Sequence, residues 1–189
     1  MPITVKALSI PDVILIEPKV FPDNRGCFFE LFRESDFHIA DLPVHFPQDN
    51  FSFSKKNVIR GLHYQRNPKA QGKLVMVIKG RIWDLAVDIR RKSPTFLKWI
   101  SMDLNDENRF MLYIPPGFAH GFLALSEDVH LLYKCTNEYD PKLDAGIRWV
   151  DPDIGIVWPV NNPILSDKDA RLPYIKQGKV LGTSQSPFQ

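Results

Sequence analysis

Residues 57–84, NVIRGLHYQRNPKAQGKLVMVIKGRIWD, combine the alternation and the turn signals that decide the fold of this chain. Residues 58–65 have the composition of a strand, and residues 66–72 form a polar loop that contains an Asn-Pro pair. An apolar run at 74–78 then ends at Lys-Gly, a tight-turn signal, before a second strand-like segment at 81–89. The stretch therefore predicts a β-hairpin unit.

Three side chains of this unit can carry chemistry: His63, Lys73 and Asp84. Asp84 lies inside the apolar strand IWDLAVD, where burial of a carboxylate is costly, so we expect it to pair with a histidine or lysine. Strict strand alternation would place Arg60 and His63 on opposite faces. If both line one cavity, Gly61 must mark a β-bulge that redirects the strand.

Short strand-like segments recur through the rest of the chain, with Gly or Pro turns between them, a pattern typical of a sandwich or barrel. Ser166 is expected to cap a short helix that reaches Ala170, and another helix is expected at 33–39. The fold class is therefore mainly β with a few short helices. The expected strands are 3–8, 13–18, 46–54, 58–65, 73–78, 81–89, 96–103, 110–114, 120–126, 129–137 and 147–150.

The amino-acid composition indicates the number of domains and the kind of ligand to expect. The chain has 189 residues, of which 44% are hydrophobic and 24% charged, which suits one well-cored domain. We expect that domain at residues 1–175, followed by a mobile tail at 176–189. The formal net charge of +2 and the absence of a Lys/Arg run argue against a nucleic-acid partner, but suit a small anionic ligand held by a few cations.

Cysteine usage and hydropathy indicate the compartment. Cys27 and Cys135 are far apart and lack metal-type spacing, so neither a disulfide framework nor a zinc site is expected. The N-terminus lacks the pattern of a signal peptide, and no apolar run is long enough to span a membrane. We therefore expect a cytoplasmic protein with no membrane partner.

A second fragment, IPPGFAHGF at 114–122, contains the pattern Pro-x-Gly-x-x-His with Gly117 and His120, and makes the chain resemble the cupins, which are double-stranded β-helix (jelly-roll) barrels. The cupin pattern of the first half is His-x-His followed by a glutamate and a closing glycine. Here Gln65 stands at the second histidine position and, with Gly80 as the closing glycine, Lys73 takes the place of the glutamate. An ammonium group has no lone pair for a metal, so the pattern predicts metal-free proton chemistry.

Over residues 12–172 the chain resembles one family more closely, the dTDP-4-dehydrorhamnose 3,5-epimerases, which are cupin-fold enzymes. The resemblance rests on many motifs that occur in the family's order. They are PxxFxDxRGxFxE at 18–30, QDN at 48–50, RGLHYQ at 60–65, QGKLV at 71–75, PPGFAHGFLALS at 115–126, YKC at 133–135, and DPDIGIxWP with LSDKDA at 151–170.

The resemblance implies roles for individual residues. His63 is the expected general base, Asp169 its dyad partner, Tyr133 the general acid on the other face, and Lys73 the group that stabilises the enolate oxygen. It also implies a homodimer in which the N-terminal strands complete the neighbouring site. The expected substrate-binding residues are Arg25, Phe28, Glu30, Gln48, Asp49, Asn50, Arg60, Asp84, His120, Tyr139, Asp144 and Lys168; no metal ligand is expected.

The implied substrate is a dTDP-linked 4-keto-6-deoxy sugar. Both C3 and C5 neighbour its carbonyl, so removal of either proton gives an enolate, and the reaction needs no cofactor. Three alternatives remain open: a cupin epimerase that acts at one carbon or on another nucleotide-linked sugar, a non-catalytic sugar-nucleotide-binding cupin, and a metal-dependent cupin oxygenase. Taken alone, His63 also fits a core histidine and Lys73 a solvated lysine.

Overall fold

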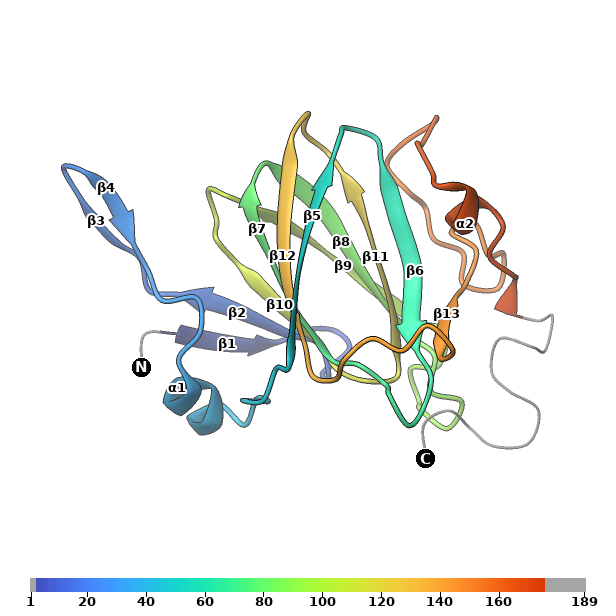
Figure 1. The fold of residues 1–189 in the computed structure, drawn as a ribbon, viewed down its shortest axis with the longest axis horizontal. Coiled ribbons are helices and arrows are strands. Elements are labelled where there is room, and N and C mark those ends of the chain that lie inside the picture. The colour runs from blue at the N-terminus through green and yellow to red at the C-terminus, as the bar shows by residue number, and fades with distance from the viewer. Residues whose placement is uncertain (1–2, 176–189) are drawn as a thin grey trace.

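Two antiparallel sheets face each other across an apolar interior in the computed structural model, which describes residues 3–175 (Figure 1). The first sheet has the order β1 (Ile3–Ala7), β2 (Ile14–Pro18), β10 (Met111–Ile114), β7 (Lys73–Lys79), β12 (Val129–Cys135), β5 (Gln48–Ser54). The second has the order β13 (Asp144–Gly146), β6 (Ile59–Gln65), β11 (Phe118–Ala124), β8 (Arg81–Asp88), β9 (Trp99–Asn105). This arrangement confirms the predicted jelly roll.

Four short elements lie outside the two sheets. The strands β3 (Phe21–Asp23) and β4 (Gly26–Phe28) form a separate hairpin that projects away from the sandwich (Figure 1). The helices α1 (Glu34–Ile39) and α2 (Asp167–Ala170) have 6 and 4 residues, too few for either to cross a bilayer. The tail expected at 176–189 lies outside the described residues.

The predicted strand at 147–150 is wrong, because β13 ends at Gly146 and the chain then turns. The backbone N–H of Asp151 donates to the carbonyl of Arg148 at 3.1 Å, which closes a turn where the strand was expected. The strand predicted from residue 96 begins instead at Trp99. The cause is Asp88, whose carboxylate accepts hydrogen bonds from hydroxyl groups of the loop before β9. These hydrogen bonds hold that loop in a turn.

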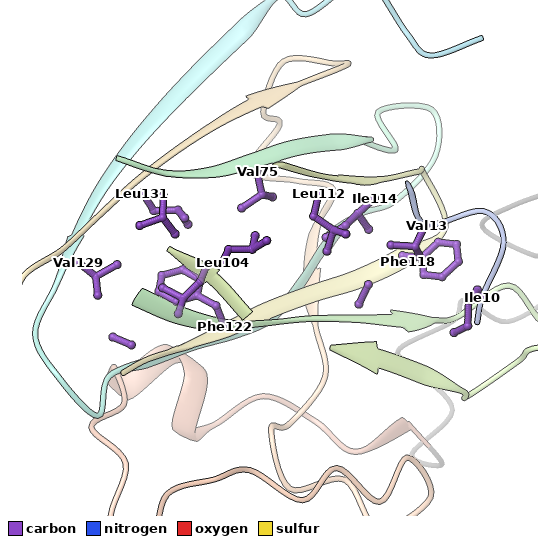
Figure 2. Close-up of a cluster of buried hydrophobic side chains, with 14 residues drawn as sticks. Ile10, Val13, Val75, Leu104, Leu112, Ile114, Phe118, Phe122, Val129 and Leu131 are labelled. Carbon is purple, nitrogen blue, oxygen red and sulfur yellow. The ribbon is translucent and has the colours of Figure 1, made fainter. Parts of the chain in front are cut away.

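The interior between the sheets is filled by apolar side chains from alternate strand positions (Figure 2). Val75 and Leu131 come from the first sheet and Phe118 and Phe122 from the second, and all four are almost completely buried. By the same alternation, polar side chains of these strands also face the interior, at positions that the apolar cluster does not fill. The core thus gives the site its rigid walls.

The outer faces of the two sheets differ. The segment after β13 covers the second sheet, where Trp158 packs edge-on against Trp83 with ring centroids 5.3 Å apart. On the first sheet, α1 covers only one part, through the buried Phe37. Phe51 and Phe53 on β5 remain 61% and 46% exposed, so this face carries an uncovered apolar area.

Candidate active site

A cavity lies between the two sheets and has two chambers that share the lining residues His63, Lys73 and Tyr133. The amide chamber, of about 280 Å³, is further lined by Gln48, Asn50, Tyr64, Gln65, Gln71, Tyr139, Asp144 and Lys168. The histidine chamber, of about 210 Å³, is further lined by Ser52, Arg60, His120 and Phe122. Residues predicted from distant parts of the sequence therefore meet in one place.

The predicted β-bulge lies at Gly61 and directs Arg60 and His63 into the same cavity. On β11, His120 pairs with His63 of β6, and Phe122 pairs with Arg60 of β6. The paired positions are therefore two residues apart on β11 but three residues apart on β6, so β6 contains one extra residue. Gly61 has φ of +131°, and a Cβ atom there would lie 2.5 Å from the Cα of Gly121 on the neighbouring strand. Only glycine fits this backbone conformation and this close approach.

His63 and Asp169 form a dyad in which Nε2 of the imidazole lies 2.7 Å from Oδ1 of the carboxylate. Ser166 caps α2 as predicted, by accepting from the backbone N–H of Asp169, and so places this carboxylate. Burial acts to raise the pKa of Asp169, but hydrogen bonds from His63 and the Gly61 N–H outweigh burial and hold this pKa below its ordinary value. The ionised carboxylate of Asp169 can only accept hydrogen bonds. Nε2 of His63 therefore carries the hydrogen, and Nδ1 of His63 is the basic atom.

Lys73 and Tyr133 face the histidines from the opposite sheet. The Nζ of Lys73 lies 3.4 Å from the carbonyl oxygen of His63 and 6.0 Å from the centre of the Tyr133 ring, so this ammonium group points into the barrel. Burial lowers the pKa of Lys73, while the nearby Asp84 and Asp144 act in the opposite direction. Burial raises the pKa of Tyr133, which keeps the phenol protonated at neutral pH.

Asp84 pairs with a histidine, as expected from its position in an apolar strand. Its Oδ1 lies 2.8 Å from Nε2 of His120, and the carboxyl group has no exposed surface. His120 lines the histidine chamber, whereas Asp84 lies behind it and does not contact the cavity. Burial lowers the pKa of His120, partly offset by Asp84.

Loop residues enclose the amide chamber through hydrogen bonds to side chains of its floor. The backbone N–H of Tyr139 donates to Gln48 at 2.6 Å, and that of Asp140 donates to Gln65 at 2.9 Å. Lys168 forms an ion pair with Asp144 at the chamber. Gln65, which occupies the cupin metal-ligand position, therefore anchors a loop.

Besides Asp84, four predicted substrate-binding residues do not line the cavity of their own chain. Asp49 points to the outer face of β5, where Lys134 binds it at 2.7 Å. Arg25 lies at the tip of the projecting hairpin, 85% exposed and paired with Asp23. Phe28 is on the same hairpin, and Glu30 just after it bonds to Arg33.

Three polar residues line the cavity that sequence reasoning did not select: Ser52, Gln65 and Gln71. Ser52 follows Gln48 and Asn50 at alternate positions of β5, so strand alternation alone could have identified it. The Oγ of Ser52 and the Nε2 of Gln65 are buried without a hydrogen-bond partner among residues 3–175. Both therefore have unused hydrogen-bonding capacity beside the cavity.

The cavity does not assemble the donor set of a metal site. Within the part of the chain that the structure describes, no three His, Cys, Asp or Glu side chains converge closely enough to hold a metal ion. Lys73 faces His63 across the space between the sheets. Cofactor-free chemistry stays a prediction.

The model of a protein family described as dTDP-4-dehydrorhamnose 3,5-epimerase matches residues 7–177. The chain belongs to the dTDP-4-dehydrorhamnose 3,5-epimerase family. The family member from Salmonella typhimurium that carries this name is 52% identical over 171 residues, which are 89% of this chain and 93% of that relative.

Solved structures of epimerases share the fold of this chain. The dTDP-4-dehydrorhamnose 3,5-epimerase of Sulfolobus tokodaii has a TM-score of 0.88 and 50% identity, and the match covers 95% of this chain and 99% of that one. A dTDP-6-deoxy-D-glucose-3,5-epimerase from Legionella pneumophila was solved in complex with dTDP-4-keto-L-rhamnose. It has a TM-score of 0.88 and 42% identity, with coverage of 92% and 93%. The epimerase family and its cupin fold, both predicted from sequence, are confirmed.

Proposed function

We propose that this chain converts dTDP-4-dehydro-6-deoxy-D-glucose to dTDP-4-dehydro-L-rhamnose by inverting C3 and C5. The observation that carries the proposal is the placement of a histidine dyad and a tyrosine on facing sheets, with a lysine beside them. Inversion needs a base on one face of the sugar ring and an acid on the other. The two walls of this cavity supply that arrangement.

Each inversion begins when Nδ1 of His63 takes the proton from a carbon next to the 4-keto group. The electron pair of the broken C–H bond moves into the ring, and the keto oxygen becomes an enolate oxygen. The ammonium group of Lys73, in a site with little water, stabilises this negative charge. Tyr133 then protonates the carbon from the opposite wall, and the imidazolium and tyrosinate return to their resting states by exchange with water.

Cations and amides around the two chambers suit the rest of the substrate. Arg60 is held by Ser54 at 2.9 Å and by the carbonyl of Phe53 at 2.8 Å, so its guanidinium has a defined position at the histidine chamber. Lys168 provides a second cation at the amide chamber. We assign these cations to the diphosphate, and the amide and Tyr139 side chains to the nucleoside.

A homodimer is part of the proposal. The uncovered apolar area on β5, with Phe51 and Phe53 packed edge-on against His130 at 5.5 Å, suits burial against a second copy. The projecting hairpin leaves Arg25 and Phe28 far more exposed than substrate-binding residues need to be in an isolated chain. A second subunit would receive them at the mouth of its cavity.

We place the reaction in the cytoplasm. Cys27 is an exposed free thiol and Cys135 a buried one, a state that a reducing compartment preserves. The proposed substrate and product are both nucleotide-linked sugars.

Incubation of the purified protein with dTDP-4-keto-6-deoxyglucose in heavy water tests the proposed function. We expect deuterium at both C3 and C5, measured by NMR, and formation of the rhamnose-configured product. Label at only one carbon would instead support a mono-epimerase. An absence of exchange, with binding retained, would support a non-catalytic sugar-nucleotide-binding protein.

A further inference from the structure

The loop between β12 and β13, residues 136–143, crosses from the first sheet to the second (Figure 1). Tyr139 on this loop lines the amide chamber and is 51% exposed. A half-exposed ring has few packing contacts, so its position depends on the backbone that carries it. The contacts between this backbone and the two sheets therefore decide where the ring lies.

Two consecutive peptide groups of the loop are bonded to opposite sheets. The N–H of Tyr139 donates to Oε1 of Gln48 on β5 at 2.6 Å, and the N–H of Asp140 donates to Oε1 of Gln65 on β6 at 2.9 Å. The strand β5 belongs to the first sheet and β6 to the second. At this point the loop is therefore held from both walls of the cavity.

A third glutamine holds the start of the loop. Nε2 of Gln71 donates to the carbonyl of Asn137 at 2.8 Å, and the side chain of Asn137 donates to the carbonyl of Ala70 at 2.8 Å. Gln71 lines the amide chamber together with Gln48 and Gln65. The glutamines that form part of the chamber wall are thus the same ones that fix the loop.

Gln65 is almost completely buried, with 3% of its surface exposed. A peptide N–H can only donate, so the Gln65 oxygen faces Asp140, while its Nε2 has no hydrogen-bond partner among residues 3–175. For packing alone, an apolar side chain of similar size would suit this position better, because it would leave no buried donor unpaired. The hydrogen bond to the loop accounts for an amide here.

We propose that Gln65 is a positioning residue for nucleotide binding, which acts by holding Tyr139 and its loop at the amide chamber. The inference rests on the proposed function, which assigns this chamber to the nucleoside. A ring that is fixed before the ligand arrives loses less conformational entropy on binding, so the hydrogen bond from Asp140 to Gln65 increases affinity. Proton transfer is not affected, because His63 keeps its own partner, Asp169.

Gln65→Met removes the acceptor for the N–H of Asp140 and keeps a side chain of similar length and volume. The loss of one hydrogen bond is expected to raise the KM for the keto sugar, and the Kd for dTDP measured by calorimetry, by about 10-fold each. We expect kcat to stay within about threefold of the wild-type value. Asn162→Met, which replaces an exposed amide outside the cavity, is the matched control and should change neither KM nor kcat.

A double-mutant cycle with Tyr139→Ala separates an action through Tyr139 from a direct contact between Gln65 and the nucleotide. If Gln65 acts through the loop, Gln65→Met should raise the Kd for dTDP by less than about twofold once residue 139 is alanine. An equal rise in both backgrounds would overturn the inference. An unchanged Kd in Gln65→Met, or a fall in kcat at unchanged KM, would overturn it as well.

Thermal unfolding shows whether each variant folds. If Gln65→Met does not fold, Gln65→Asn, whose amide is one methylene shorter, takes its place in the cycle. Binding of dTDP needs no turnover, so a wild type that binds dTDP without epimerising the sugar would refute the proposed reaction and leave the cycle to decide the inference. A wild type that does not bind dTDP would refute the nucleoside assignment, and the inference with it.

Discussion

Nε2 of His63 on β6 lies 2.7 Å from Oδ1 of Asp169 on α2, although the two residues are 106 positions apart in the chain. The bulge at Gly61 aims the histidine, and the cap at Ser166 places the aspartate. The backbone N–H of Gly61 also donates to the same carboxylate at 3.3 Å. One glycine thus supports both members of the dyad.

Asp169→Asn is expected to reduce kcat by about 100-fold or more, because an asparagine can bind the wrong imidazole tautomer and no longer stabilises the imidazolium. The fold should persist, since the amide fills the same volume. Steady-state kinetics and thermal unfolding measure the two effects. Asp167→Asn, exposed on the same helix, is the control; a wild-type kcat in Asp169→Asn would contradict the dyad.

The same carboxylate should contribute to acid stability. Its folded-state pKa is below its ordinary value, so its stabilisation is complete above the unfolded-state pKa of about 3.9 and is lost as the pH falls through the folded-state pKa. The urea concentration at the unfolding midpoint should therefore fall more steeply with decreasing pH, between about pH 6 and pH 3, in the wild type than in Asp169→Asn. Parallel curves would show that the dyad does not contribute to acid stability.

Lys73→Met is expected to lower kcat by about 100- to 1000-fold, because the enolate oxygen loses its cation. At pH 7 the lysine is charged in the unfolded chain, and burial disfavours that charge in the folded one. The variant should therefore unfold at the same temperature as wild type or a higher one. Lys79→Met, at the exposed end of β7, serves as control; a joint loss of activity and stability in Lys73→Met would indicate a structural role instead.

Gly61→Ala should destabilise the protein and reduce activity together. The positive φ and the approach of the new methyl group to Gly121 force β6 away from β11, with backbone strain alone costing about 1–3 kcal/mol. Gly155→Ala is the matched control, because Gly155 also has positive φ but no atom near the position of a Cβ. A smaller loss of unfolding free energy is expected there, with activity unchanged.

Mixed dimers test the contribution of the hairpin to a neighbouring site. Arg25→Ala and His63→Asn homodimers should each be inactive or nearly so. In a mixed dimer, the Arg25→Ala subunit keeps its own His63 and receives Arg25 from its partner, so one of two sites works. Co-refolding equal amounts should restore about a quarter of wild-type activity, since about half of the dimers are mixed. No recovery, with mixed dimers shown by native mass spectrometry, would contradict the shared site.

Strand periodicity and turn residues were enough to predict the architecture of this chain from its sequence. The alternation in residues 57–84 and the regular spacing of strand-like segments predict a jelly roll, and the conflict between Arg60 and His63 in that alternation predicts the bulge at Gly61. Errors occurred where hydrogen bonds of turns and side chains override the strand preference of a segment. Asp88 holds the loop before β9 in a turn, and the turn closed by Asp151 lies where the strand at 147–150 was expected.

The sequence by itself determined which residue types carry the chemistry, because an imidazole, an ammonium group and a phenol in ordered motifs keep their intrinsic reactivity wherever the chain places them. Only the tertiary structure decided which of them meet. It joined His63 to Asp169 and His120 to Asp84, placed Lys73 and Tyr133 on the facing wall, and left Asp49 on the outer face and Arg25 on a projecting hairpin. Hydrogen-bond partners depend on strand register and sheet packing, which are properties of the whole chain and not of any short stretch of it.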